Sequence, residues 1–190
     1  MSNRKRLAIL GAAFACLALA APVVAQAAVW KHNGVNLAKL ITLSLPGGEV
    51  FETEVEGVWS GMSCEVKATM TTEGGSTAKI TAYEVKSCSG GFGKMTGCEL
   101  STKEAKSLPW TVDVNTSDLT ITNMRIKRTF KAGCKVTELD KTLTSVKVIL
   151  NTPAKITEME FSGSLVGPPG YKAFGSWKVE GTNSGTYGIG

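Results

Sequence analysis

The chain has 190 residues, which is the length of one domain together with a processing segment. Hydrophobic residues make up 43% of it, enough for a packed core, so the composition excludes a globally disordered chain. The formal charge of +5 is modest and no concentrated basic stripe is present, so we expect no nucleic-acid partner.

The start of the chain has the three parts of a secretory signal peptide. Arg4-Lys5-Arg6 is the positive region, and an uncharged run rich in alanine and leucine extends from Leu7 to Ala21. Ala25-Gln26-Ala27 then places small residues at a cleavage site. The alternatives are a retained membrane anchor, for which this run is short, and lipidation at Cys16.

Cleavage at this site would divide the chain into two parts. We expect residues 1–27 to be removed and residues 28–190 to form a single secreted domain without a membrane span. Removal of the leader also takes away three basic residues, so the mature chain would be nearly neutral.

Short β-rich segments separated by Gly, Pro, Asn and Asp follow one another through the mature chain. Valine and threonine, which suit a pleated surface, are frequent in these segments. The strands expected in chain order are residues 49–59, 64–70, 78–85, 110–114, 119–130, 135–139, 142–150, 155–161 and 177–180, with 186–189 as a last strand. Gly74-Gly75 lies between two alternating segments and predicts a β-hairpin.

Two segments are less regular. Residues 37–45 fit either a helix or a strand, and Pro46-Gly47-Gly48 is expected to end that element. Residues 100–108 could hold one short helical turn.

Alternation within the strands assigns side chains to faces. Trp59 and Trp110 lie within apolar alternation, which indicates core packing for both. In residues 119–130, strict alternation gives one face with Thr120, Thr122, Met124, Ile126 and Arg128, and another with Leu119, Ile121, Asn123, Arg125 and Lys127. About ten short strands with frequent turns predict an all-β fold, a single antiparallel sandwich or barrel.

The mature chain keeps four cysteines, Cys64, Cys88, Cys98 and Cys134. An even number in an exported chain predicts two disulfides, which would staple the fold. We expect Cys88–Cys98, which closes a glycine-rich loop, together with Cys64–Cys134. The hairpin at Gly74-Gly75 favours a different pairing, because it brings Cys64 close to Cys88.

Several short motifs resemble a group of secreted actinobacterial proteins. They are Ser63-Cys64-Glu65-Val66, the loop from Ser87-Cys88-Ser89-Gly90 to Gly97-Cys98, Leu108-Pro109-Trp110, and Gly133-Cys134-Lys135-Val136. The resemblance covers most of the mature chain and implies export from an actinobacterium-like cell. It carries over no catalytic residue.

The candidate ligand-binding residues are one acidic row and one tyrosine. Glu52, Glu54 and Glu56 recur at every second position, so we expect all three on one solvated strand face. Tyr171 follows Gly167-Pro168-Pro169-Gly170, a stretch that cannot join a sheet interior, so its ring is expected to be exposed.

These observations favour a secreted, non-enzymatic module without metal or cofactor that binds an extracellular or cell-envelope ligand, such as a carbohydrate. One alternative is a small glycoside hydrolase that uses paired carboxylates. The other is a β-barrel that carries an apolar small molecule.

Overall fold

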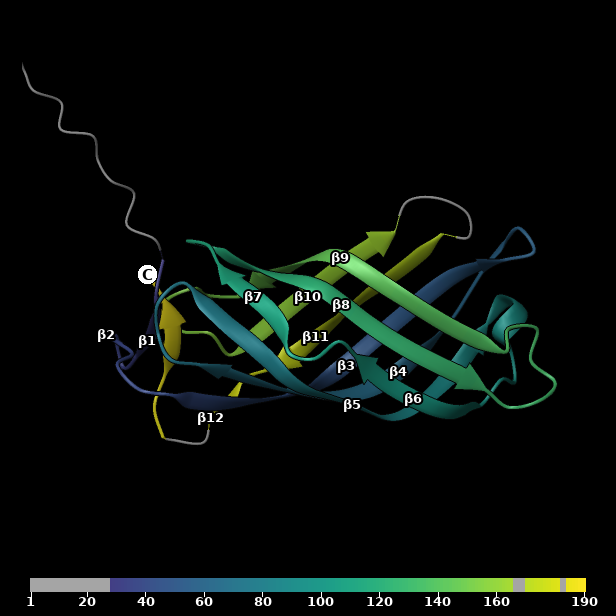
Figure 1. The fold of residues 1–190 in the computed structure, drawn as a ribbon, viewed down its shortest axis with the longest axis horizontal. Helices are drawn as coiled ribbons and strands as arrows, with labels where there is room; N and C mark the ends of the chain where they lie inside the picture. Colours follow the sequence, from purple (N-terminus) through teal and green to yellow (C-terminus); the bar gives the residue numbers. More distant parts are fainter. Residues whose placement is uncertain (1–27, 166–169, 182–183) are drawn as a thin grey trace, which may run out of the picture.

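Long antiparallel strands make up most of the molecule (Figure 1). The computed structural model describes residues 28–165, 170–181 and 184–190, so the expected leader lies outside the described residues. In chain order the elements are β1 (Trp30–His32), β2 (Val35–Asn36), β3 (Ile41–Val55), β4 (Val58–Thr72), β5 (Thr77–Phe92), the 3-10 turn η1 (Gly93–Met95), β6 (Leu100–Lys106), β7 (Trp110–Val114), β8 (Asp118–Phe130), β9 (Glu138–Leu150), β10 (Glu158–Leu165), β11 (Tyr171–Lys178), β12 (Glu180–Gly181) and β13 (Tyr187–Ile189). No helix in this part of the chain has the length and apolar character needed to cross a membrane.

Eight strands close into an antiparallel barrel. Around the barrel they follow the order β3, β4, β5, β7, β8, β9, β10 and β11, and β11 pairs again with β3. β6 lies outside this path and pairs with the second half of β8, whereas β7 pairs with its first half. The all-β prediction is confirmed, and of the two expected architectures the barrel is the one formed. Several strands are longer than expected, since β3 and β4 have 15 residues each.

Both irregular segments are strands. Residues 100–106 form β6 because they pair with β8, so the expected helical turn is wrong. β3 runs straight through Pro46-Gly47-Gly48, so the expected end there is wrong as well. Gly47 lets β11 approach closely, because a Cβ atom at this position would lie 2.0 Å from the carbonyl oxygen of Ser176.

A small three-stranded sheet, in the order β13, β1, β2, lies beside one end of the barrel (Figure 1). Trp30 pairs with Ile189 in this sheet, and both side chains are buried. The amide of Ile156 donates to the carbonyl of Tyr187, which ties the sheet to the loop before β10. The expected strand over residues 186–189 is confirmed as β13.

The alternation of buried side chains in β8 shifts by one residue at Asn123. Leu119 and Ile121 are buried before it, and Met124, Ile126 and Arg128 are buried after it. The backbone of Asn123 has a φ of 57°, which lies in the left-handed region. Strict alternation placed Leu119 and Ile121 on the face opposite to Met124, Ile126 and Arg128, and this assignment is wrong because all five side chains point into the barrel. The shift at Asn123 is what turns Arg128 inward.

The disulfides are Cys64–Cys88 and Cys98–Cys134. The prediction that all four cysteines are oxidised is confirmed, and the expected pairing is wrong. Counting back from the Gly74-Gly75 turn places Cys64 opposite Val85 or Lys86. Register shifts between Thr69 and Met70 and between Glu65 and Val66 move the ladder, so that Cys64 stands directly opposite Cys88.

Candidate ligand-binding face

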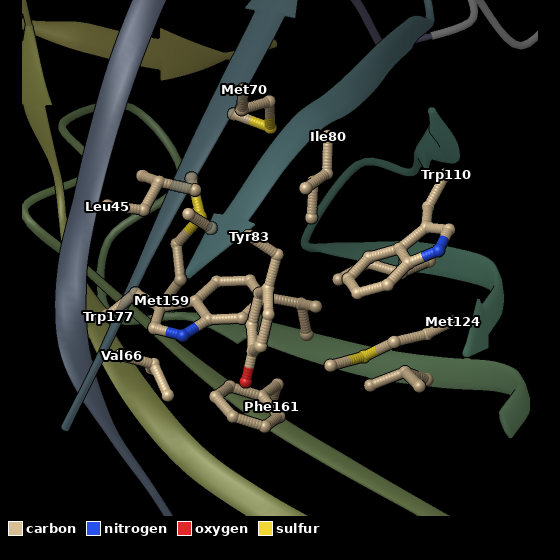
Figure 2. Packing of buried hydrophobic residues seen from close by; sticks show 14 of the residues in the cluster. Leu45, Val66, Met70, Ile80, Tyr83, Trp110, Met124, Met159, Phe161 and Trp177 are labelled. Carbon is tan, nitrogen blue, oxygen red and sulfur yellow. The ribbon is translucent and has the colours of Figure 1, made fainter. Parts of the chain in front are cut away.

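Aromatic rings fill the interior of the barrel (Figure 2). The ring of Tyr83 lies 5.3 Å from that of Trp110 and 6.5 Å from that of Trp177, measured between centroids. Phe161 packs against Trp177 at 4.5 Å. Trp110 is buried as predicted. The carrier alternative needs an apolar cavity at this place, and these side chains occupy the space instead.

A polar cluster lies among these rings. The guanidinium of Arg128 donates to Glu49 Oε1 and, at 2.8 Å, to the hydroxyl of Tyr171. The hydroxyl of Tyr83 donates to Glu49 Oε2. Arg128 also lies over the ring of Phe51, 4.3 Å from its centroid. The cluster thus joins β3, β5, β8 and β11 across the barrel.

Burial and charge change the titration of this cluster. Burial raises the pKa of Tyr83 well above its ordinary value, and the Glu49 carboxylate raises it further. Burial also raises the pKa of Tyr171, although the nearby Arg128 cation acts in the opposite direction. For Arg128, burial is the largest single influence and acts to lower the pKa, but the Glu49 carboxylate and the hydroxyls of Tyr171 and Tyr83 together outweigh it, so the net pKa is raised. The guanidinium is therefore a permanent charge inside the barrel.

Tyr171 does not present an exposed ring. Its side chain is 2% exposed, points into the barrel and accepts the hydrogen bond from Arg128. The expectation of exposure is wrong because β11 begins at Tyr171 itself, and the strand register pairs Tyr171 with the buried Thr53. The glycine-proline stretch before it lies mostly outside the described residues.

A groove with a volume of about 520 Å³ lies on the outer surface of the barrel, over β3, β4, β9, β10 and β11. Strand register places Ser162, Phe174, Val50 and Ser63 side by side across four neighbouring strands. Phe174 is 40% exposed and Ile149 is 52% exposed, and these two are the exposed large apolar side chains of its lining. We call this feature the outer groove; it is lined by Gly48, Glu49, Val50, Ser63, Ile149, Glu160, Phe161, Ser162, Phe174, Gly175 and Ser176.

The lining of the outer groove also includes polar side chains. Among the described residues, the hydroxyls of Ser63, Ser162 and Ser176 form no hydrogen bond with another side chain or with the backbone. Glu160 is exposed and has no ion pair with a described residue. Gly48 has no side chain, so no side chain fills the groove at this position. The groove therefore combines one exposed aromatic ring with several unoccupied hydrogen-bonding groups.

A second aromatic surface lies on the same outer face. Trp59 is 41% exposed, so the prediction that it packs in the core is wrong, and Lys172 Nζ lies 4.2 Å from the centroid of its ring. Phe92 is 38% exposed and lies against Gly61, where a Cβ atom would be 3.0 Å from its ring. We call Trp59 and Phe92 together the Trp59 platform.

The acidic row is divided between a strand and a turn. Glu52 and Glu54 lie on the outer face of β3, half-buried, opposite Gly61 and Trp59. Glu56 lies in the following turn with a φ of 51° and pairs with Lys94 at 3.4 Å. The expectation of one continuous face holds for Glu52 and Glu54 and is wrong for Glu56, because β3 ends at Val55.

Glu54 and Glu56 also line a pocket at the end of the barrel, together with Glu138 and Asp140. Three of these carboxylates are held in ion pairs. Two hydrogen bonds of 2.7 Å join Arg125 to Asp140, Lys127 lies 2.8 Å from Glu138, and Lys94 pairs with Glu56. The hydrogen bond from Arg125 lowers the pKa of Asp140. These contacts resemble a solvated charged rim more than the opposed pair of carboxyl groups that glycoside hydrolysis needs.

The part of the chain that the structure describes contains no group of three or more histidine, cysteine and acidic side chains that could hold a metal ion. Nothing matches the chain among protein-family models, curated proteins or solved structures. The interpretation of function therefore depends on the geometry of the outer face.

Proposed function

We propose that this protein is a secreted, non-enzymatic β-barrel module that binds a carbohydrate of the extracellular space or the cell envelope. The outer groove is the binding site in this proposal. The single observation that carries it is the exposed ring of Phe174 beside the hydroxyls of Ser162, Ser176 and Ser63, which have no hydrogen-bond partner in the part of the chain that the structure describes.

Sugars offer two kinds of surface that this groove complements. Their C–H faces pack against aromatic rings, and Phe174 presents such a ring to solvent. Their hydroxyls both donate and accept hydrogen bonds, as the serine hydroxyls and the Glu160 carboxylate require. An apolar ligand would bury those polar groups without partners, at a cost of about 1–3 kcal/mol each.

The rest of the outer surface supports this choice of site. On β8 and β9 the exposed charges are held in ion pairs, such as Arg125–Asp140, Lys127–Glu138 and Lys147–Asp118. Paired charges of this kind keep a strand face solvated. The face with the outer groove instead carries three partly exposed aromatic rings, those of Phe174, Trp59 and Phe92.

Export is supported by two independent features. The leader pattern over residues 1–27 is typical of secreted proteins. The two disulfides, Cys64–Cys88 and Cys98–Cys134, are of the kind that persists in oxidising compartments outside the cytoplasm.

The test is co-sedimentation of the purified protein with insoluble cellulose, chitin, xylan and bacterial peptidoglycan. We expect the wild type to bind at least one of these, and Phe174→Ala to lower the affinity about tenfold, which corresponds to the loss of about 1.4 kcal/mol of stacking. Leu40→Ala is the matched control, because Leu40 is an exposed apolar side chain outside the outer groove.

The outcomes separate binding from general stickiness. Equal loss of binding in Phe174→Ala and Leu40→Ala would contradict the assignment of the site. Failure of the wild type to bind any of the four glycans, or release of soluble sugar from one of them, would contradict the proposed function.

A further inference from the structure

We infer that the ligand of this face is an extended glycan chain without negative charge, which runs from the outer groove to the Trp59 platform. This inference rests on the proposed function and names the class of carbohydrate. It is based on the observation that the outer groove and the Trp59 platform lie on the same outer face of the barrel, on the neighbouring strands β11, β3 and β4.

The distance between the two aromatic surfaces can be estimated from the strand register. Trp59 stands opposite Glu54, and Phe174 stands opposite Val50, so the two aromatic residues are two strands and four residues apart. With strands about 4.8 Å apart and about 3.4 Å per residue, their Cα atoms lie roughly 17 Å apart. One sugar ring cannot contact both, whereas a chain of several rings can.

The path between them is low and polar. Lys172, Glu52 and Gly61 form one row across β11, β3 and β4, between Phe174 and Trp59. Gly61 is buried under the ring of Phe92, which would lie 3.0 Å from a Cβ atom there, so this row leads directly onto the Trp59 platform. Glu52 and Lys172 offer hydrogen-bonding groups to the hydroxyls of a passing chain.

Charge on this face selects against anionic chains. Glu160 lies in the outer groove, and Glu52 and Glu54 lie next to the Trp59 platform. Lys172 is the cation in the row between them, and its ammonium is placed over the ring of Trp59. Carboxylates at both ends of the path would repel a chain that carries a carboxylate on each unit.

The experiment is titration calorimetry with oligosaccharides of two to six units derived from cellulose, xylan and chitin, and with an oligogalacturonate of six units. For the wild type we expect six uncharged units to bind at least about tenfold more tightly than two, since one more aromatic contact is gained. Trp59→Ala should bind six units no better than two, while its affinity for two units stays unchanged. Phe92→Ala, a milder change on the same platform, should reduce the gain in part.

Three results would contradict this inference. If two units bind the wild type as tightly as six, or if the oligogalacturonate binds as well as the uncharged chains, the extended uncharged chain is wrong and the outer groove stands as the site. If Trp59→Ala weakens two units and six units equally, Trp59 belongs to the groove itself and the chain-length argument fails. If no oligosaccharide of any length binds, the proposed function fails together with the inference.

Discussion

Arg128 and Glu49 form an ion pair inside the barrel, and both side chains are fully buried. They come from strands on opposite sides of the barrel, β8 and β3. The pair is completed by the hydroxyls of Tyr171 and Tyr83, which contact the guanidinium and the carboxylate respectively. Because both charges are buried, each is stabilised mainly by the other, and the loss of one partner leaves the other charge uncompensated.

The first prediction concerns this pair. Arg128→Met should destabilise the protein by about 3–5 kcal/mol, because the Glu49 carboxylate is left in an apolar interior without its cation. Glu49→Leu should cost a similar amount for the converse reason. The double variant should cost clearly less than the sum of the two single changes. Urea unfolding of the wild type, the two single variants and the double variant measures these free energies. If the loss in the double variant equals the sum of the two single losses, the ion pair does not couple Arg128 and Glu49 energetically.

The second prediction concerns alkaline pH. Tyr83 has a raised pKa because of its burial and the Glu49 carboxylate, so the folded protein keeps its phenol neutral at a pH where the unfolded chain ionises. The contribution of the neutral Tyr83 phenol to the stability of the fold is fully present below the unfolded pKa of about 10. It is lost as the pH rises above that value toward the folded pKa. The free energy of unfolding should therefore fall as the pH rises above about 10.

Tyr83→Phe provides the comparison for that pH dependence. At neutral pH it should be less stable than the wild type, because Glu49 loses a hydrogen-bond donor. Its stability should decline less steeply above pH about 10, since one of the buried phenols is gone. Urea unfolding at a series of pH values gives both slopes, and parallel curves would exclude Tyr83 as a source of the decline.

The alternation of side chains was enough to predict the all-β class and most strands, because one face of each strand is buried. It failed where the chain departs from a period of two. The left-handed Asn123 shifts the buried face of β8, and only that shift turns Arg128 inward. A residue such as asparagine tolerates this conformation without requiring it, so the shift could not be read from the residue type.

The same limit explains the disulfides and the candidate site. The pairing of Cys64 with Cys88 depends on register shifts in the β4–β5 ladder, and no turn motif in the sequence predicts these shifts. Tyr171 was assigned from its neighbours in sequence, whereas its partner Arg128 is 43 residues away in the chain. Phe174 and the serines of the outer groove carry no local signal, because the register of four strands brings them together.

The third prediction concerns the disulfides. Non-reducing peptide mapping should link Cys64 to Cys88 and Cys98 to Cys134. The double variant Cys98→Ala with Cys134→Ala should lose about 3–4 kcal/mol, since that bridge spans 36 residues and its closure limits the unfolded chain. A peptide that links Cys88 to Cys98 would contradict the pairing. An unchanged urea midpoint in the double variant would show that the closed loop contributes no stability.

The last prediction concerns Glu52, Glu54 and Glu56, replaced together by glutamine. Each residue is exposed or half-buried, and the ion pair of Glu56 with Lys94 is on the surface, where such pairs contribute about 0–1 kcal/mol. The free energy of unfolding should therefore change by only a few tenths of a kcal/mol per site, roughly the range of ordinary surface substitutions. Urea unfolding checks this, with Glu49→Gln as the buried comparison that should cost far more. A large loss in the triple variant would mean that the row is structural. A glycan hydrolysed by the wild type and left intact by the folded triple variant would make the row catalytic, and the protein an enzyme.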